Sequence, residues 1–205
     1  MDAAIIPRLK QRLTEPLPGK KAQLKMAPSF RPDINKTENT TKAGVLLLLF
    51  PNPVELHLVL MKRPTYAGVH SDQISFPGGK FEPVDHTLID SAIREAQEEV
   101  GVPSDSIQVL GVLTELYIPV SEIEVLPVIG FCRQKPIFRI DPKEVSYLIE
   151  EKVSLLFNPM IKGIKPFSNE KYAGDIPYYD IQGNHVWGAT AMILNEFLEV
   201  LNDIK

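Results

Sequence analysis

The sequence predicts an α+β fold in which a mixed β-sheet lies between α-helices. Expected strands and helices interleave along the chain without strict βα alternation, which favours both parallel and antiparallel pairing. Residues 44–50 form an unbroken apolar run, typical of a strand that is buried on both faces. With 44% hydrophobic and 23% charged residues, the 205-residue chain has enough apolar material for one core with additional segments.

The chain divides into two parts by composition. We expect an N-terminal helix and extended arm over residues 1–42 and the main domain over residues 43–205. Within the first part, residues 1–14 have the pattern of a short amphipathic helix. Residues 15–42 are rich in Pro, Lys, Asn and Thr, which predicts a loop.

The predicted strands of the main domain are short, apolar or alternating segments bounded by turn residues. Two hairpins are expected, one turning at 51–53 and the other at 182–184. The predicted strands are 44–50, 55–61, 107–113, 124–133, 177–181 and 185–187.

Three segments of the main domain have helical patterns. The first covers about 86–100, with Asp85 as a plausible N-cap and Gly101 as the stop. The second begins at Pro142 and runs to about residue 157, because Pro is favoured in the first helical turn. The third covers 189–202 and is amphipathic.

Composition also narrows the class of protein. The formal net charge of −4 does not suggest a nucleic-acid partner. A single cysteine, Cys132, excludes an intramolecular disulfide and fits a reducing compartment. No signal peptide is visible, and no apolar run approaches the ~20 residues needed to span a bilayer. A cytoplasmic protein without a membrane partner is the expectation.

Three carboxylates, Glu95, Glu98 and Glu99, lie at helical spacings i, i+3 and i+4 behind the glycine turn Gly78-Gly79. These spacings place side chains on one helix face, where like charges repel by roughly 0.2–0.5 kcal/mol per pair. A solvated helix face would explain the triplet alone. Together with the glycine turn, it indicates a divalent cation held by hard oxygen ligands, with Mg²⁺ the leading candidate.

The same segment resembles the Nudix hydrolase family. Gly79 is followed by five residues and Asp85, then by eight residues and the run Arg94-Glu95-Ala96-Gln97-Glu98-Glu99-Val100-Gly101-Val102. The family pattern has a seven-residue spacer and Glu at the position of Asp85. Both departures are similar to the coenzyme A pyrophosphatase branch, as are the segments 70–79, 141–145 and 186–190. The upstream motif of that branch matches at Arg63 and departs from it at Pro64, Gly68 and Asp72.

The resemblance implies a Nudix fold and metal-dependent hydrolysis of a diphosphate linked to another moiety, with Mg²⁺ or Mn²⁺. On the branch resemblance, the substrate is coenzyme A or an acyl-coenzyme A, and the products are 3′,5′-ADP and (acyl-)4′-phosphopantetheine. A second hypothesis is the same chemistry on ADP-ribose, a dinucleotide or a nucleoside triphosphate. A third is a nucleotide-binding module without turnover. A homodimer is a further expectation at the family level.

The residue roles follow from the motif and from the chemistry of a diphosphate. The expected metal ligands are Glu95, Glu98, Glu99 and the carbonyl of Gly79, because a glycine turn lets backbone approach a ligand. Arg94 is expected to clamp neighbouring acidic or backbone groups. The general base stays open between Glu98, Glu144, Glu150 and Glu115. The candidate catalytic residues are thus Glu98, Arg94 and Glu144, and the candidate substrate-binding residues are Arg63, His70 and Lys80.

Overall fold

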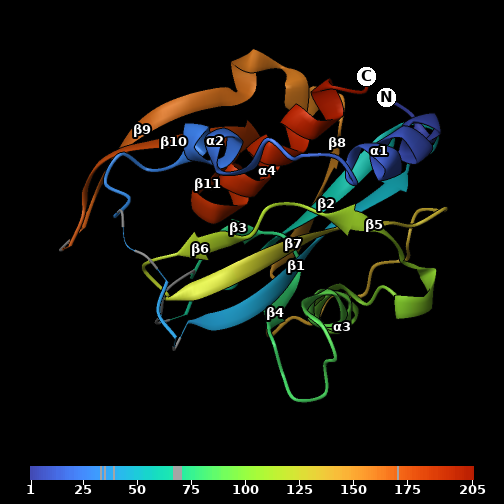
Figure 1. Ribbon diagram of the computed structural model, residues 1–205, viewed down its shortest axis with the longest axis horizontal. Coiled ribbons are helices and arrows are strands. Elements are labelled where there is room, and N and C mark those ends of the chain that lie inside the picture. The colour runs from blue at the N-terminus through green and yellow to red at the C-terminus, as the bar shows by residue number, and fades with distance from the viewer. Residues whose placement is uncertain (33, 35, 39, 67–70, 170) are drawn as a thin grey trace.

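The computed structural model describes residues 1–32, 34, 36–38, 40–66, 71–169 and 171–205. Its described residues form an eight-stranded mixed sheet with the path β3-β2-β1-β7-β5, and a three-stranded sheet with the order β11-β10-β9. Figure 1 shows helix α3 below the large sheet, with α4, α1 and α2 above it. The predicted mixed sheet between helices is therefore confirmed.

Strand β1 (Thr41–Pro51) lies at the centre of the large sheet. It runs parallel to β7 (Ile123–Phe131) and antiparallel to β2 (Leu56–Lys62). Its side chains alternate between two hydrophobic cores: Leu47 and Leu49 pack in the core that contains α4, and Leu46, Leu48 and Phe50 pack in the core that contains α3. The prediction of a strand buried on both faces is confirmed.

Helix α3 (Leu88–Val100) ends where predicted, at Gly101 in the left-handed region with φ 70°. Its N-cap is Thr87 rather than Asp85. The Thr87 side chain and the Asp90 side chain form a reciprocal capping box, which satisfies two backbone N–H groups at once. Asp85 bonds the side chains of Ser91 and Arg94 instead, so it is not available as a cap.

The helix predicted from Pro142 to about residue 157 is wrong. These residues form a turn, strand β8 (Tyr147–Lys152) and the 3₁₀ turn η4 (Leu155–Phe157). Strand β8 pairs antiparallel with β2 from Tyr147 to Lys152. The backbone of β8 thereby satisfies the hydrogen-bonding groups along one edge of β2. The side chains of β8 alternate in burial, with Ile149 and Glu151 buried and their neighbours more exposed.

The remaining strands include both predicted and unpredicted elements. Strand β5 (Gln108–Val112) and the hairpin of β10 (Ala173–Ile181) and β11 (Asn184–Trp187) match the prediction, as does helix α4 (Gly188–Asn202). Four short or polar strands lacked a clear sequence signal. They are β3 (Ile74–Ser75), β4 (Gly78–Lys80), β6 (Leu116–Ile118) and β9 (Lys162–Ser168).

The N-terminal segment packs against the main body. A 3₁₀ turn (Ala3–Ile5) and α1 (Ile6–Arg12) confirm the predicted helix, and residues 15–42, predicted as a loop, contain α2 (Gly19–Gln23) and a 3₁₀ turn (Leu24–Met26). The reason is tertiary. The Gln23 Nε2 atom donates to the buried Glu196 carboxylate at 2.8 Å, and Asn195 Nδ2 donates to the Ala22 carbonyl at 2.9 Å.

Candidate active site

Three carboxylates converge at the N-terminal ends of strands β8 and β4 and the last turns of α3. Oxygen atoms of Glu95, Glu99 and Glu144 all lie within 4.8 Å of one another. Glu95 and Glu99 are one helical turn apart on α3, whereas Glu144 reaches the cluster from the turn that precedes β8. The group thus joins two helix residues with one from a segment 45 positions further on than Glu99.

Glu99 is buried, with an exposed fraction of 1%. Its carboxylate accepts hydrogen bonds from the Gly78 backbone N–H at 2.7 Å and from Arg63 Nη2 at 3.2 Å. Burial raises the pKa of Glu99 to about 8, because desolvation outweighs the favourable interactions with Arg63 and Gly78. Burial also raises the pKa of Glu95. The raised pKa values of both carboxyl groups mean that the positive charge around them does not offset the cost of their burial.

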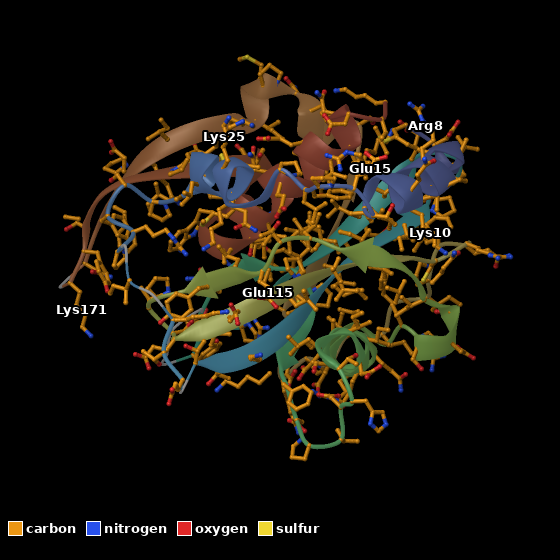
Figure 2. All side chains as sticks on the ribbon, in the orientation of Figure 1. Arg8, Lys10, Glu15, Lys25, Glu115 and Lys171 are labelled. Atoms are coloured by element: carbon orange, nitrogen blue, oxygen red, sulfur yellow. The ribbon has the colours of Figure 1, made fainter. Side chains whose placement is uncertain are left out.

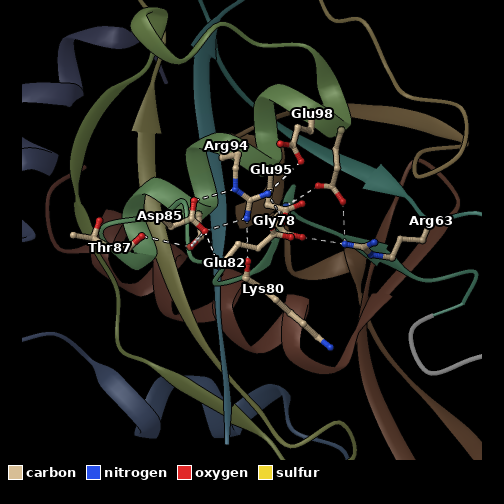
Figure 3. A network of polar contacts seen from close by, with 11 residues as sticks. Arg63, Gly78, Lys80, Glu82, Asp85, Thr87, Arg94, Glu95 and Glu98 are labelled. Carbon is tan, nitrogen blue, oxygen red and sulfur yellow. Dashed lines mark hydrogen bonds and ion pairs between the residues drawn. The ribbon is translucent and has the colours of Figure 1, made fainter.

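Arg94 holds the groups around this cluster together (Figure 3). Its guanidinium donates to Asp85 at 2.9 and 3.1 Å and to the Lys80 carbonyl at 3.1 Å. These contacts are with an acidic side chain and a backbone carbonyl. Arg94 also donates to Glu95 at 3.0 Å and to Glu98 at 3.2 Å. The Arg94 charge holds the pKa of Asp85 well below its usual range, so Asp85 stays ionised.

Gly79 lies directly against the carboxylate of Glu95. A Cβ atom at this position would come within 2.2 Å of the Glu95 Oε1 atom. Gly79 belongs to β4, which pairs with β1 through Gly44, so its backbone is held in place by the sheet. A side chain at this position would displace the Glu95 carboxylate from its present place, so glycine lets Glu95 lie in the cluster.

The other predicted site residues differ in whether they contact the carboxylate cluster. Glu98 is on the same helix face but is exposed, and its carboxylate contacts Arg94 rather than the cluster. Arg63 contacts Glu99, and the exposed side chain of Lys80 extends away from Arg94 in Figure 3. Glu150 forms an ion pair with Lys135 at 2.6 Å. His70 lies outside the described residues.

The donor set fits a hard divalent cation. Carboxylate oxygens are among the ligands that Mg²⁺ and Mn²⁺ prefer. Three carboxylates within 4.8 Å, one of them buried, repel one another unless positive charge is added between them. Glu95 and Glu99 would hold the ion, and Glu144 faces them from the turn before β8.

The carboxylates line a cavity of about 940 Å³. Its walls also carry Arg63 and Lys80, together with aromatic side chains that come from distant parts of the chain. These aromatic residues are Phe30, Tyr66, Phe76, Phe167, Tyr172 and Trp187. The sequence gives no signal for this grouping, because the six aromatic residues are isolated along the chain and follow no periodic pattern.

A comparison with protein families matches residues 40–155 to the NUDIX domain. The chain belongs to the Nudix hydrolase family. It is therefore an enzyme of the pyrophosphohydrolase type, and members of this family generally use divalent metal ions. The matched range contains the glycine strand β4, helix α3 and Glu144, which together form the carboxylate site.

Relatives and solved structures agree with the family. The chain is 32% identical to the uncharacterized Nudix hydrolase NudL of Pectobacterium atrosepticum, over 88% of this chain and 91% of that protein. It is also 32% identical to NudL of Salmonella dublin, over 82% and 86% of the two chains. The fold is similar to that of the Nudix hydrolase RenU of M. smegmatis, with a TM-score of 0.58 and 16% identity over 83% and 94% of the chains.

A second solved neighbour is the NUDIX domain of NrtR from Shewanella oneidensis, determined in complex with ADP ribose. Its TM-score is 0.53 at 12% identity, over 80% of this chain and 90% of that one. At such identities the likeness establishes the fold. Among the described helices, none combines the length and hydrophobicity required to cross a bilayer.

Proposed function

We propose that this Nudix hydrolase cleaves the diphosphate bond of coenzyme A or an acyl-coenzyme A in the presence of Mg²⁺ or Mn²⁺. The products would be 3′,5′-ADP and 4′-phosphopantetheine or its acyl form. The observation that carries the proposal is the convergence of Glu95, Glu99 and Glu144 inside a cavity of about 940 Å³. This volume is near the upper end of small-molecule sites, which favours a long substrate.

The branch of the family is inferred from sequence motifs. The box from Gly79 to Val102 has the longer spacer and the Asp85 of the coenzyme A pyrophosphatases, and segments 141–145 and 186–190 are similar to theirs. Two of these segments meet at the cavity, since Lys143, Glu144 and Trp187 through Thr190 all line it. Residues that resemble the branch therefore line the cavity in which we propose that the substrate binds.

The chemistry assigned to the site is attack of water on one phosphorus atom, with cleavage of the bond between that phosphorus and the bridging oxygen. When bound, the cation supplies neutralisation of the diphosphate charge and activation of water. A carboxylate accepts the proton that water loses. Glu144 is our first candidate for this base, because it belongs to the cluster and is exposed toward solvent, and Glu98 is the second.

The surrounding residues position these groups. Arg94 fixes the direction of Glu95 and ties α3 to Asp85 and to the backbone of Lys80. We assign it an orienting role in catalysis. Arg63 and Lys80 line the same cavity and supply positive charge for the phosphates. We also assign His70 to substrate binding, on the motif alone.

The test is a panel of substrates offered to purified protein with Mg²⁺ or Mn²⁺ and resolved by chromatography. Coenzyme A and acetyl-coenzyme A are expected to be cleaved faster than ADP-ribose, dinucleotides and nucleoside triphosphates. The control is the Glu99→Gln variant purified in the same way, because activity that remains with this variant measures the contaminating enzymes. If coenzyme A stays intact while another diphosphate is cleaved, the substrate assignment is wrong and the family chemistry is retained.

A further inference from the structure

A stack of aromatic rings forms a second wall of the cavity, away from the carboxylates. The ring of Phe30 stacks on Phe167 with a centroid distance of 5.2 Å and on Tyr172 at 5.5 Å. Phe167 in turn lies 5.7 Å from Trp187. All four side chains are half-buried and line the cavity, so each still has surface that a ligand could cover. Planar aromatic faces of this kind suit a nucleobase.

The wall is held in place by hydrogen bonds between the N-terminal segment and strand β10. Ser29 N donates to the Asp175 carbonyl at 2.9 Å, and Asp175 N donates to the Ser29 hydroxyl at 2.8 Å. Gly174 permits this contact, because a Cβ there would lie 2.4 Å from Ser29 Oγ. Figure 2 shows Lys171 at the tip of the β9–β10 hairpin that completes the wall. The site is thus present before a ligand arrives.

Arg31 follows Phe30 and belongs to the lining of the same cavity. Its guanidinium is half-buried, lines the cavity and donates to the backbone carbonyl of Tyr117 on β6. Within the described part of the chain, no carboxylate lies within ion-pair distance of Arg31. Burial without such a partner lowers the pKa of Arg31. A half-buried cation that is left without an anion is a recognition group for one.

The sheet sets how far Arg31 lies from the carboxylates. At this end of the large sheet, β4 pairs with β1, β1 with β7, and β7 with β6. Gly79 on β4 and Tyr117 on β6 are therefore three strand spacings apart and offset by two residues along the strands, which is roughly 16 Å. Among the described residues, the acidic side chains that line the cavity all belong to the carboxylate cluster. Arg63 also lines the cavity, but it donates a hydrogen bond to Glu99. Lys80, Lys143 and Lys171 also line the cavity, but their side chains are exposed, so Arg31 is the half-buried cation that faces an anion beyond the diphosphate.

We infer that Arg31 is a specificity-determining residue that binds a phosphomonoester on the nucleoside of the substrate, while the base of that nucleoside stacks on Phe30. The inference rests on the proposed function in placing the diphosphate at the carboxylate cluster. A ribose phosphate occurs at the 3′ position in coenzyme A and at the 2′ position in NADPH. Each has a counterpart without this phosphate, dephospho-coenzyme A and NADH.

The experiment measures kcat/KM for both pairs in the wild type and in Arg31→Gln. Removal of one charge-assisted contact is expected to lower kcat/KM roughly 10- to 100-fold for the phosphorylated member. The unphosphorylated member should change by less than about threefold, since it makes no such contact. The matched control is Arg8→Gln on α1, a change of the same type on the exposed surface outside this cavity (Figure 2).

Binding provides a readout that does not depend on turnover. In titration calorimetry, 3′,5′-ADP and 2′,5′-ADP are compared with 5′-AMP, and Arg31→Gln should abolish the tighter binding of a bisphosphate. If the wild type cleaves none of the four substrates but shows this preference, the proposed function fails and the inference on Arg31 holds. If Arg31→Gln unfolds, as judged by circular dichroism, Arg31→Lys replaces it and should retain part of the preference. The inference is overturned if the wild type has no preference or if the variants keep all of it.

Discussion

The two ends of the cavity are assembled in different ways. The carboxylate end is built mostly from one continuous stretch, β4 and α3, which spans residues 78 to 100. The aromatic end combines residues 28–32, β9, β10 and β11, which are far apart in the sequence. Local periodicity places Glu95 and Glu99 together, whereas only tertiary packing brings Phe30 to Phe167. We therefore expect chemistry to depend on the first end and substrate choice on the second.

The largest expected effect comes from Glu99→Gln at the carboxylate end. Loss of one buried anionic ligand removes several kcal/mol of transition-state stabilisation, which corresponds to a kcat about 1,000-fold lower. Glu98→Gln should lower kcat as well but by less, because Glu98 is exposed and contacts Arg94 instead of the cluster. Steady-state kinetics on the substrate identified by the panel provide the measurement.

The control for this pair is Glu150→Gln, whose carboxylate is paired with Lys135. We expect it to keep kcat within about threefold, as is usual for a residue outside the site. Thermal unfolding of each variant checks that the fold is intact. Equal kcat values for the wild type and Glu99→Gln would show that Glu99 is not a ligand of the metal ion.

A second prediction concerns the stability of the metal-free protein. The pKa of Glu99 is raised to about 8, from about 4.3 in an unfolded chain. Between these values the folded state holds a proton that the unfolded state has released. This contribution to stability is complete below about pH 4 and is lost as the pH rises toward 8, by at most about 1.4 kcal/mol per pH unit.

The measurement is the Tm in EDTA and in excess Mg²⁺ between pH 5 and pH 8. Because a cation replaces the proton, Mg²⁺ should raise Tm more at pH 8 than at pH 5. Glu99→Gln has no ionisable group at this position, so it should flatten the pH dependence in EDTA. A Tm difference between the two conditions that is independent of pH would contradict the assignment.

The smallest effect is expected at the aromatic end, from Phe30→Ala. Stacking of a base on an aromatic ring is worth about 1–3 kcal/mol, so KM should rise roughly 5- to 100-fold. The kcat value should stay within a few-fold, because the carboxylate end is unchanged. Loss of kcat without a change in KM would mean that the two ends do not divide chemistry from binding as we describe.

Sequence patterns were sufficient where one helix or strand determines the geometry. The apolar run of β1, the end of α3 at Gly101 and the carboxylate spacing all follow from local periodicity and turn residues. Sequence patterns gave the wrong secondary structure where contacts with a distant segment of the chain determine it. The segment from Pro142 has helical spacing, but it forms strand β8 because it pairs with the edge of β2. Residues 15–42 contain a helix because Glu196 and Asn195 form hydrogen bonds with polar groups of that helix.

The sequence by itself determined the reaction class of this protein, because the Nudix box is contiguous and its chemistry depends on spacing along one helix. It also identified Glu144 as a candidate without showing that it reaches Glu95 and Glu99. That convergence, the burial of Glu99 and the position of Arg31 were decided by the tertiary structure. They depend on strand pairing between segments that are distant in sequence, and no local pattern encodes which of these distant strands become neighbours.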